Sequence, residues 1–272
     1  MSFRAACIQN TATTDIGHDI GVLGAMIREA AGRGAAFVAT PEYCAGLDTR
    51  EGKLFPVAFE EAEHPVLPAM QALADELRIW LLLGSIGVKA PDGRIFNRSF
   101  MLDPEGRIAA RYDKIHLFDI NLGEGRVYQE SATIAAGHKG VVAPCAEGMI
   151  GLSICYDIRF PQLYRSYAQA GAQMLAAPAA FTRVTGEAHW HVLQRARAIE
   201  NGAYVISPCQ SGTLLGGAEC FGHSLIVDPW GRVLADGGEE QGIITAEIDL
   251  ELAADTRRRI PSLKHDRPFA VP

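Results

Sequence analysis

Hydrophobic positions recur along the chain in two patterns, one with the helical period of about 3.6 residues and one in short runs of strand length. Residues 16–33 show the first pattern, with Ile20, Leu23 and Ile27 on one face and glycines at the end. Further helices are predicted over residues 65–78, 161–170 and 187–201, with a short one capped by Asp249. Strands are predicted over residues 4–9, 36–39, 80–88, 97–102, 107–112, 149–154, 173–177, 203–207, 222–227, 231–235 and 243–248.

Two of these strand pairs are joined by turn sequences and therefore predict hairpins. One turn is Asp103-Pro104-Glu105-Gly106, and the other surrounds residues 228–231. Proline presets the backbone of such a turn and glycine takes its left-handed position. Because helices and strands otherwise alternate, the pattern indicates an α/β layered fold with mixed sheets. Residues 113–138 form a long polar stretch with few periodic positions.

Length, composition and charge narrow the class of protein. The 272 residues fit one large domain, residues 1–272, and 48% hydrophobic with 21% charged residues is ordinary for a folded chain. A net charge of −7 disfavours a nucleic-acid partner, which needs clustered Lys and Arg. The longest apolar run, residues 80–88, is too short to span a bilayer, and residues 1–10 lack a signal-peptide core. We therefore expect a cytoplasmic protein without a membrane or nucleic-acid partner.

Cysteine usage agrees with a reducing compartment. The six cysteines form no C-x-x-C pair and no Cys/His cluster with zinc spacing, so the sequence predicts neither a disulfide scaffold nor a metal site. Most of them are expected to be small core residues, and one could be a nucleophile. They are Cys7, Cys44, Cys145, Cys155, Cys209 and Cys220.

Cys155 stands where a predicted buried strand gives way to a helix, in the segment 151–161. This is the arrangement of a nucleophile elbow, in which the thiol is exposed at a tight turn. The helix N-terminus would lower the pKa of the thiol and offer N–H groups to an oxyanion, and Asp157 could cap the helix. A small buried cysteine is the alternative interpretation.

Four more residues have types suited to catalysis. Glu42 follows the strand 36–39 after a proline, at a strand end where ligands bind in open sheets. Lys114 follows the strand 107–112 and could stabilise developing negative charge. Glu130 lies in the polar stretch, and His116 raises the possibility of a Cys-His pair, although a structural histidine is the favoured interpretation. Taken alone, Glu42 and Glu130 are better interpreted as surface residues, and a solvated surface lysine is the alternative for Lys114.

Together these segments resemble the nitrilase, or carbon–nitrogen hydrolase, superfamily, and within it the Nit-type amidases (deaminated glutathione amidase and ω-amidase). The motifs occur in the family's order over nearly the whole chain, and they are jointly specific. They are Ala5-Ala-Cys-Ile-Gln-Asn10, Glu42, Tyr-x-Lys114-x-His-Leu-Phe-Asp, Glu130-Ser, Gly-x-x-Ile-Cys155-Tyr-Asp-x-Arg-Phe-Pro, Thr185-Gly186-x-x-His189-Trp190, Arg195-Ala-Arg197-Ala-Ile-Glu200-Asn201, Gly222-His-Ser-x-x-Val-Asp-Pro-Trp-Gly231 and Arg258-Arg-Ile-Pro261. One departure is Gln162 in place of the family's Glu, which we expect to affect packing and not chemistry.

The resemblance implies a four-layer α-β-β-α sandwich that pairs into a homodimer or higher homo-oligomer. It implies Cys155 as nucleophile, Glu42 as general base and acid, Lys114 as stabiliser of the tetrahedral intermediate, and Glu130 as an auxiliary carboxylate. The backbone N–H of Tyr156 would assist Lys114 in holding the oxyanion. The reaction, amide hydrolysis through a cysteine thioester, needs no metal or organic cofactor.

For the substrate, the segment after the strand 173–177 is informative, because its end should face the cleft. Phe181, Thr182 and Arg183 are predicted to contact substrate, and Arg183 could bind a carboxylate through two hydrogen bonds. A surface arginine is an equally weighted alternative. Arg197 and Glu200 are expected to form a structural ion pair.

The predicted activity is therefore hydrolysis of a small carboxylate-bearing amide, either deaminated glutathione or the ω-monoamide of a dicarboxylate. An N-carbamoyl amino acid hydrolase or a nitrilase would use the same residues. A catalytically inactive binding scaffold is the alternative outside enzymes, and the presence of Glu42, Lys114 and Cys155 argues against it.

Overall fold

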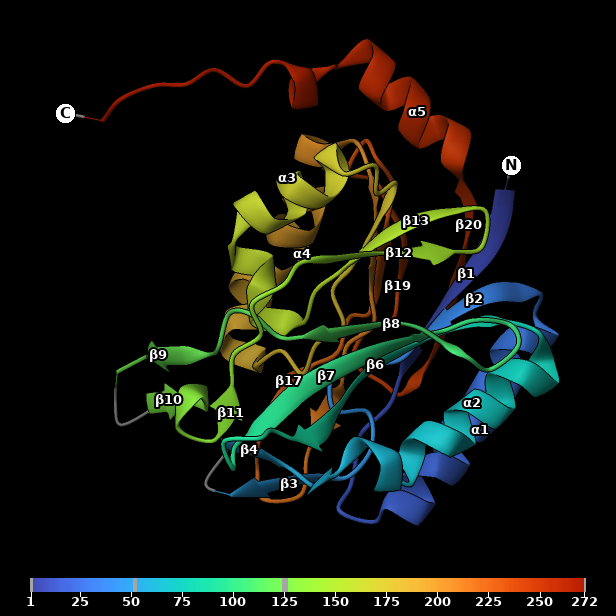
Figure 1. Cartoon of the computed structure of the whole chain (residues 1–272), viewed down its shortest axis with the longest axis vertical. Helices are drawn as coiled ribbons and strands as arrows, with labels where there is room; N and C mark the ends of the chain where they lie inside the picture. Colours follow the sequence, from blue (N-terminus) through green and yellow to red (C-terminus); the bar gives the residue numbers. More distant parts are fainter. Residues whose placement is uncertain (1, 51–52, 124–126, 272) are drawn as a thin grey trace.

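In the computed structural model, two β-sheets are stacked face to face, and helices cover the outer face of each sheet (Figure 1). The structure describes residues 2–50, 53–123 and 127–271. The first sheet has the order β11-β7-β6-β2-β1-β20, and β5 and β8 pair with β6 and β7. Its strands are β1 (Ser2–Gln9), β2 (Ala35–Ala39), β5 (Ala58–Phe59), β6 (Trp80–Lys89), β7 (Ile95–Leu102), β8 (Ile108–Asp113), β11 (Ile134–Ala135) and β20 (Gly242–Asp249). The parallel pairs β1–β2 and β2–β6 lie beside antiparallel ones, so the sheet is mixed as predicted.

The second sheet has the order β12-β13-β14-β15-β18-β19. Its strands are β12 (Val141–Cys145), β13 (Gly148–Leu152), β14 (Met174–Ala176), β15 (Tyr204–Ser207), β18 (Leu225–Val227) and β19 (Val233–Asp236). The three central strands β13, β14 and β15 run parallel. Their carboxyl ends therefore meet at one edge, and the loop after β13 carries Cys155.

Alternation along the strands divides the core between the layers. In β1, Ala6 and Ile8 pack in one cluster with Leu23 of helix α1 (Ile16–Gly32). Ala5 and Cys7 point the other way and pack in the cluster that contains residues of the second sheet. Helix α2 (Val66–Leu77) lies beside α1, whereas α3 (Pro161–Gln169) and α4 (Arg183–Asn201) cover the second sheet, which completes the four layers (Figure 1).

The C-terminal segment leaves this sandwich at one end. Helix α5 (Leu250–Arg259) follows β20, and the Asp249 carboxylate accepts a hydrogen bond from Glu251 N–H, as the capping prediction requires.

The predicted ion pair between Arg197 and Glu200 is present at 2.8 Å, and Gln162 is exposed on α3. Within the described residues, no helix combines the length and apolarity needed to cross a membrane.

Several short elements were not predicted. They are the ribbons β3–β4 (Leu47–Arg50, Lys53–Pro56), β9–β10 (Asp119–Asn121, Val127–Gln129) and β16–β17 (Ser211–Thr213, Glu219–Phe221), the strands β5, β11 and β12, and the 3₁₀ turns η1 (Glu61–Glu63), η2 (Glu130–Ala132), η3 (Cys155–Arg159) and η4 (Ser262–Lys264). Helix α4 begins at Arg183, earlier than the predicted residue 187. Residues 124–126 of the polar stretch lie outside the described residues.

Candidate active site

Cys155 occupies a strained turn just beyond β13. Its φ angle is +48°, a left-handed conformation that few non-glycine residues adopt. Its backbone N–H donates to the Pro178 carbonyl at 2.8 Å, which links the turn to the segment after β14. The elbow prediction is thus met in its backbone shape, but the element that begins at Cys155 is the 3₁₀ turn η3, and helix α3 starts only at Pro161.

The fully buried carboxylate of Asp157 holds this turn in place. It accepts hydrogen bonds from the Tyr112 hydroxyl at 2.6 Å and from Ile154 N–H at 2.8 Å. His116 also contacts it, through its backbone N–H at 3.0 Å and its ring Nδ1 at 2.7 Å. The imidazole of His116 stacks on Phe160 with centroids 3.5 Å apart. His116 is therefore engaged in positioning the turn, in agreement with the structural interpretation.

Glu42 lies beyond the end of β2 and is almost completely buried. Its Oε1 accepts hydrogen bonds from Asn97 Nδ2 at 2.8 Å and from Lys114 Nζ at 3.0 Å. Its Oε2 accepts the backbone N–H of Ala180 at 2.8 Å. Both carboxylate oxygens are thus held, and the thiol of Cys155 lies close enough for the carboxylate to affect its titration.

Lys114 is buried between two carboxylates. Its Nζ lies 3.0 Å from Glu42 and 2.9 Å from Glu130, so one ammonium joins the two acids. Burial disfavours the ammonium, but the attraction of Glu130 and Glu42 prevails and raises the pKa of Lys114 well above its usual range. Burial also raises the pKa of the Glu130 carboxyl, against the opposing effect of Lys114. Glu130 additionally accepts Phe118 N–H at 2.6 Å, which holds the loop after Lys114.

The pKa of the Cys155 thiol is shifted upward, whereas the sequence predicted a lowered pKa. Burial, followed by the nearby Glu42 carboxylate, raises the pKa of Cys155 well above its usual value. The expected effect of a helix N-terminus is not the dominant one here, because the thiol is desolvated and only a short 3₁₀ turn follows it. The resting form is therefore the neutral thiol, which must lose its proton to a base before it can attack.

A pocket of about 450 Å³ opens over these groups. Glu42, Lys114, Glu130 and Cys155 all contribute to its wall. The predicted substrate-contacting residues line it as well, together with several apolar side chains; the set includes Phe181, Thr182, Arg183, Leu54, Phe55, Phe118, Tyr128 and Val184. Its volume lies in the range of roughly 300–1,000 Å³ usual for small-molecule sites. The four predicted catalytic side chains and the three predicted substrate contacts thus meet in one cavity.

Arg183 differs from the prediction in its setting. It is the first residue of α4 and not part of a loop, because the helix begins earlier than its apolar spacing suggested. Its guanidinium lies 3.0 Å from Glu239 and 3.9 Å and 4.0 Å from Glu187 and Glu219. A substrate carboxylate would have to compete with these acids.

Tyr156, the second residue of η3, is half-buried, and the role of its N–H stays a prediction.

Sequence reasoning missed three contributors to the site. Asn97 is fully buried in β7 and donates to Glu42, but it stands beside Arg98 and Ser99 in that strand, so the sequence carries no distinct signal for it. The N–H of Ala180 has no signature in the side-chain pattern. Tyr43 lines the pocket at a φ of +48°, and its buried hydroxyl has no hydrogen-bond partner among the described residues.

Comparison with known proteins shows the family to which the chain belongs. The carbon-nitrogen hydrolase family model matches residues 4–258. The chain is 40% identical over 268 residues to a deaminated glutathione amidase of Synechocystis sp., with 97% of each chain covered. It is 37% identical over 266 residues to the human omega-amidase NIT2, covering 98% of this chain and 95% of the relative.

Among solved structures, Saccharomyces cerevisiae Nit3, a member of branch 10 of the nitrilase superfamily, superposes with a TM-score of 0.84 at 28% identity. That match covers 96% of this chain and 94% of Nit3. The family match spans most of the chain, and the relatives are similar over nearly their full length. This chain therefore belongs to the carbon-nitrogen hydrolase family.

Proposed function

We propose that the protein is a cysteine-dependent amidase that hydrolyses a small carboxylate-bearing amide to a carboxylate and ammonia or an amine. The observation that carries the proposal is the convergence of Cys155, Glu42 and Lys114 in one pocket, with Lys114 Nζ 3.0 Å from Glu42. The names of the similar amidases from Synechocystis sp. and human support the same reaction class.

The first half-reaction forms a thioester. At rest the Cys155 thiol is neutral, because the pKa of Cys155 is raised. Glu42 takes the proton from this thiol, and the sulfur attacks the amide carbonyl. Lys114, held as an ammonium by two carboxylates, stabilises the oxyanion together with the backbone N–H of Tyr156. Glu42 then returns the proton to the nitrogen, the C–N bond breaks, and ammonia or an amine leaves.

The second half-reaction consumes water. Glu42 removes a proton from a water molecule, whose oxygen attacks the thioester carbonyl, and the C–S bond breaks. The departing thiolate of Cys155 recovers a proton from Glu42, so the enzyme returns to its starting state. Glu130 keeps Lys114 in place through both steps, because its carboxylate contacts Nζ at 2.9 Å and 3.0 Å.

Deaminated glutathione and the ω-monoamides of dicarboxylates are the proposed substrates. The names of the relatives support both, and the apolar wall around Phe181 can hold the carbon chain of either. We assign Arg183 to the substrate carboxylate at the rim of the pocket, in competition with Glu239. An N-carbamoyl amino acid or a nitrile is the alternative substrate for the same residues.

A panel of amides and nitriles tests the proposal. The purified enzyme should release ammonia or an amine from deaminated glutathione or from dicarboxylate ω-monoamides, and much less from nitriles and N-carbamoyl amino acids. Cys155→Ala should abolish turnover with an unchanged circular dichroism spectrum, whereas Cys220→Ala, a buried thiol that also lines the pocket, should remain active. Turnover of no compound, or full activity of Cys155→Ala, would support an inactive scaffold or another nucleophile.

Three further features belong to this proposal. The protein is proposed to act in the cytoplasm, where its six buried cysteines stay reduced. It is proposed to work as a single domain, residues 1–272, that assembles into a homodimer or higher homo-oligomer. Light scattering at micromolar protein should give a mass of at least twice that of the chain, and a mass equal to one chain would contradict the assembly.

A further inference from the structure

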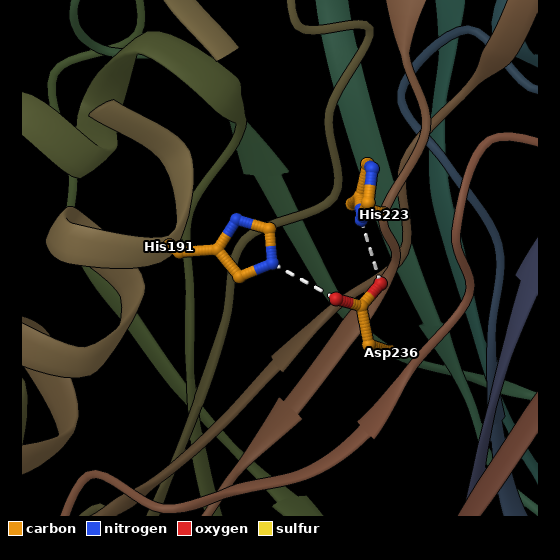
Figure 2. A group of neighbouring side chains, drawn as sticks. All are labelled: His191, His223 and Asp236. Carbon is orange, nitrogen blue, oxygen red and sulfur yellow. Dashed lines mark hydrogen bonds and ion pairs between the residues drawn. The ribbon is translucent and has the colours of Figure 1, made fainter. Parts of the chain in front are cut away.

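Two histidines and an aspartate meet at a point outside the active-site pocket. His191 lies on α4, His223 precedes β18, and Asp236 ends β19, so three separate segments contribute (Figure 2). His191 Nε2 lies 2.9 Å from one carboxylate oxygen, and His223 Nδ1 lies 2.8 Å from the other. The three ligand-type atoms lie within 4.8 Å of one another. None of the three residues lines the pocket that contains Cys155.

The surrounding structure fixes these side chains. Gly238 N–H donates to Asp236 Oδ1 at 2.9 Å, which orients the carboxylate. The ring of His223 stacks on Phe221 with centroids 4.5 Å apart, and its backbone is held in a left-handed conformation at φ +51°. Trp190 Nε1 donates to the His223 carbonyl at 2.7 Å, which ties that segment to α4. A position strained in this way persists only where several contacts determine it.

The charge of the cluster suits a cation. Asp236 contributes a carboxylate whose two oxygens face the two imidazole nitrogens, at 2.9 Å from His191 and 2.8 Å from His223. The neighbouring Glu239 is occupied by Arg183 at 3.0 Å and need not take part. Two imidazole nitrogens and one carboxylate form a donor set preferred by Zn²⁺, Ni²⁺ and Cu²⁺ and unlike the all-oxygen sets of Mg²⁺ and Ca²⁺.

We propose that His191, His223 and Asp236 form a binding site for a divalent transition-metal ion such as Zn²⁺. In the bound state His191 Nε2 and His223 Nδ1 coordinate through their lone pairs, and each ring carries its proton on the other nitrogen. Ligand bonds of about 2.0–2.1 Å would place the donor atoms about 3.4 Å apart in a tetrahedral site, so small ring rotations suffice. Water completes the coordination.

The sequence carries no spacing signal for this site. The three residues come from distant segments, and only the packing of α4 against the edge of the second sheet brings them together. An ion there would join α4 to β19. The site is independent of the proposed amidase function, because its ligands are not the residues assigned to catalysis.

Equilibrium dialysis against Zn²⁺ tests the proposal. The thiol of Cys155 is first blocked with iodoacetamide, so that the active site does not contribute, and metal per chain is measured by mass spectrometry. We expect one Zn²⁺ per chain at micromolar free metal, and no competition from millimolar Mg²⁺ or Ca²⁺. The affinity should fall at least tenfold in His191→Ala and in Asp236→Asn.

Two controls make the result decisive. His189→Ala removes an exposed histidine from the same helix and should leave Zn²⁺ binding unchanged. Co²⁺ added to the blocked protein should give visible absorption bands that His191→Ala abolishes, while thermal melting without metal shows that the variant is folded. Failure to bind at 100-fold higher Zn²⁺, or equal binding by folded His191→Ala and the parent, would overturn the proposal.

Discussion

At the scale of single residues, the site combines a protonated thiol with a lysine that is held charged. Burial acts on both groups but with different results, because Lys114 lies between two carboxylates, whereas Cys155 faces a carboxylate that further disfavours the thiolate. A thiol of this kind reacts only when a base is in place. The proposed catalytic mechanism therefore depends on Glu42, which has no role in a Cys-His pair.

Replacing the base distinguishes these two mechanisms. Glu42→Gln keeps a side chain able to bond Asn97 and Lys114 but cannot accept the thiol proton, so kcat/KM for the best amide should fall by about 10²-fold or more. His116→Ala should cost much less, because the imidazole of His116 bonds Asp157 and not the thiol. Steady-state assays of both folded variants provide the comparison. The opposite ranking would favour a Cys-His mechanism.

Replacing Arg183 tests whether this residue selects amides that carry a carboxylate. Charge-assisted hydrogen bonds are typically worth roughly 1.5–3 kcal/mol, so Arg183→Ala should lower kcat/KM about 10- to 100-fold for amides that carry a carboxylate. Neutral aliphatic amides should be spared, and labelling of Cys155 by iodoacetamide should not change. Arg195→Ala, also on α4 but not among the residues lining the pocket, is the matched control. Equal losses on acidic and neutral amides would show that Arg183 binds only Glu239 and its neighbours.

At the scale of elements, the turn after β13 depends on one buried acid. Asp157→Ala would leave the Tyr112 hydroxyl and the N–H groups of Ile154 and His116 without their acceptor. Each unsatisfied buried group costs about 1–3 kcal/mol, so the free energy of unfolding should drop by at least about 3 kcal/mol. Urea denaturation measures it, and Asp255→Ala on the exposed face of α5 should change it little. An unchanged midpoint for Asp157→Ala would contradict this account of the turn.

The elements that the sequence predicted share one property, namely a regular apolar pattern. Helix α1 buries one face and strand β6 is buried along nearly its whole length, so a helical period and a continuous apolar run located them closely. The ribbon β9–β10 falls in the polar stretch and has intermediate or exposed residues throughout, so no alternation marks it. Helix α4 begins with Arg183 and Val184 only partly covered, which explains why its apolar spacing becomes visible one turn later.

The active site likewise contains some residues that the sequence predicted and others that only the packed structure reveals. Cys155, Glu42, Lys114 and Glu130 were found because their side chains belong to motifs with recognisable neighbours. Asn97 of β7 and the N–H of Ala180 both hold Glu42, and the second contact arises only when the segment after β14 packs against the first sheet. The pKa of Cys155 also depends on that stacking, because burial outweighs the turn that follows it. Tertiary burial is thus the part that local sequence could not supply.

At the scale of the whole molecule, a buried histidine couples stability to pH. His64, just before α2, is 2% exposed, and burial lowers its pKa to about 4. In the unfolded chain the pKa is about 6.5, so below that value the unfolded state binds more protons than the folded one. The stabilisation is therefore complete above pH 6.5 and is lost as the pH falls from about 6.5 toward 4.

The loss should reach up to about 3 kcal/mol of unfolding free energy at pH 4, which follows from about 1.4 kcal/mol for each pH unit between the two pKa values. His64→Asn removes the titration but keeps an acceptor for Val66 N–H, which bonds His64 Nδ1 at 3.3 Å. Guanidinium denaturation of both proteins from pH 7.5 to 4 isolates the contribution, since other acids titrate equally in both. We expect their difference in stability to narrow toward acid by up to about 3 kcal/mol. A difference that does not vary with pH would show that His64 is protonated in the folded protein as readily as in the unfolded chain.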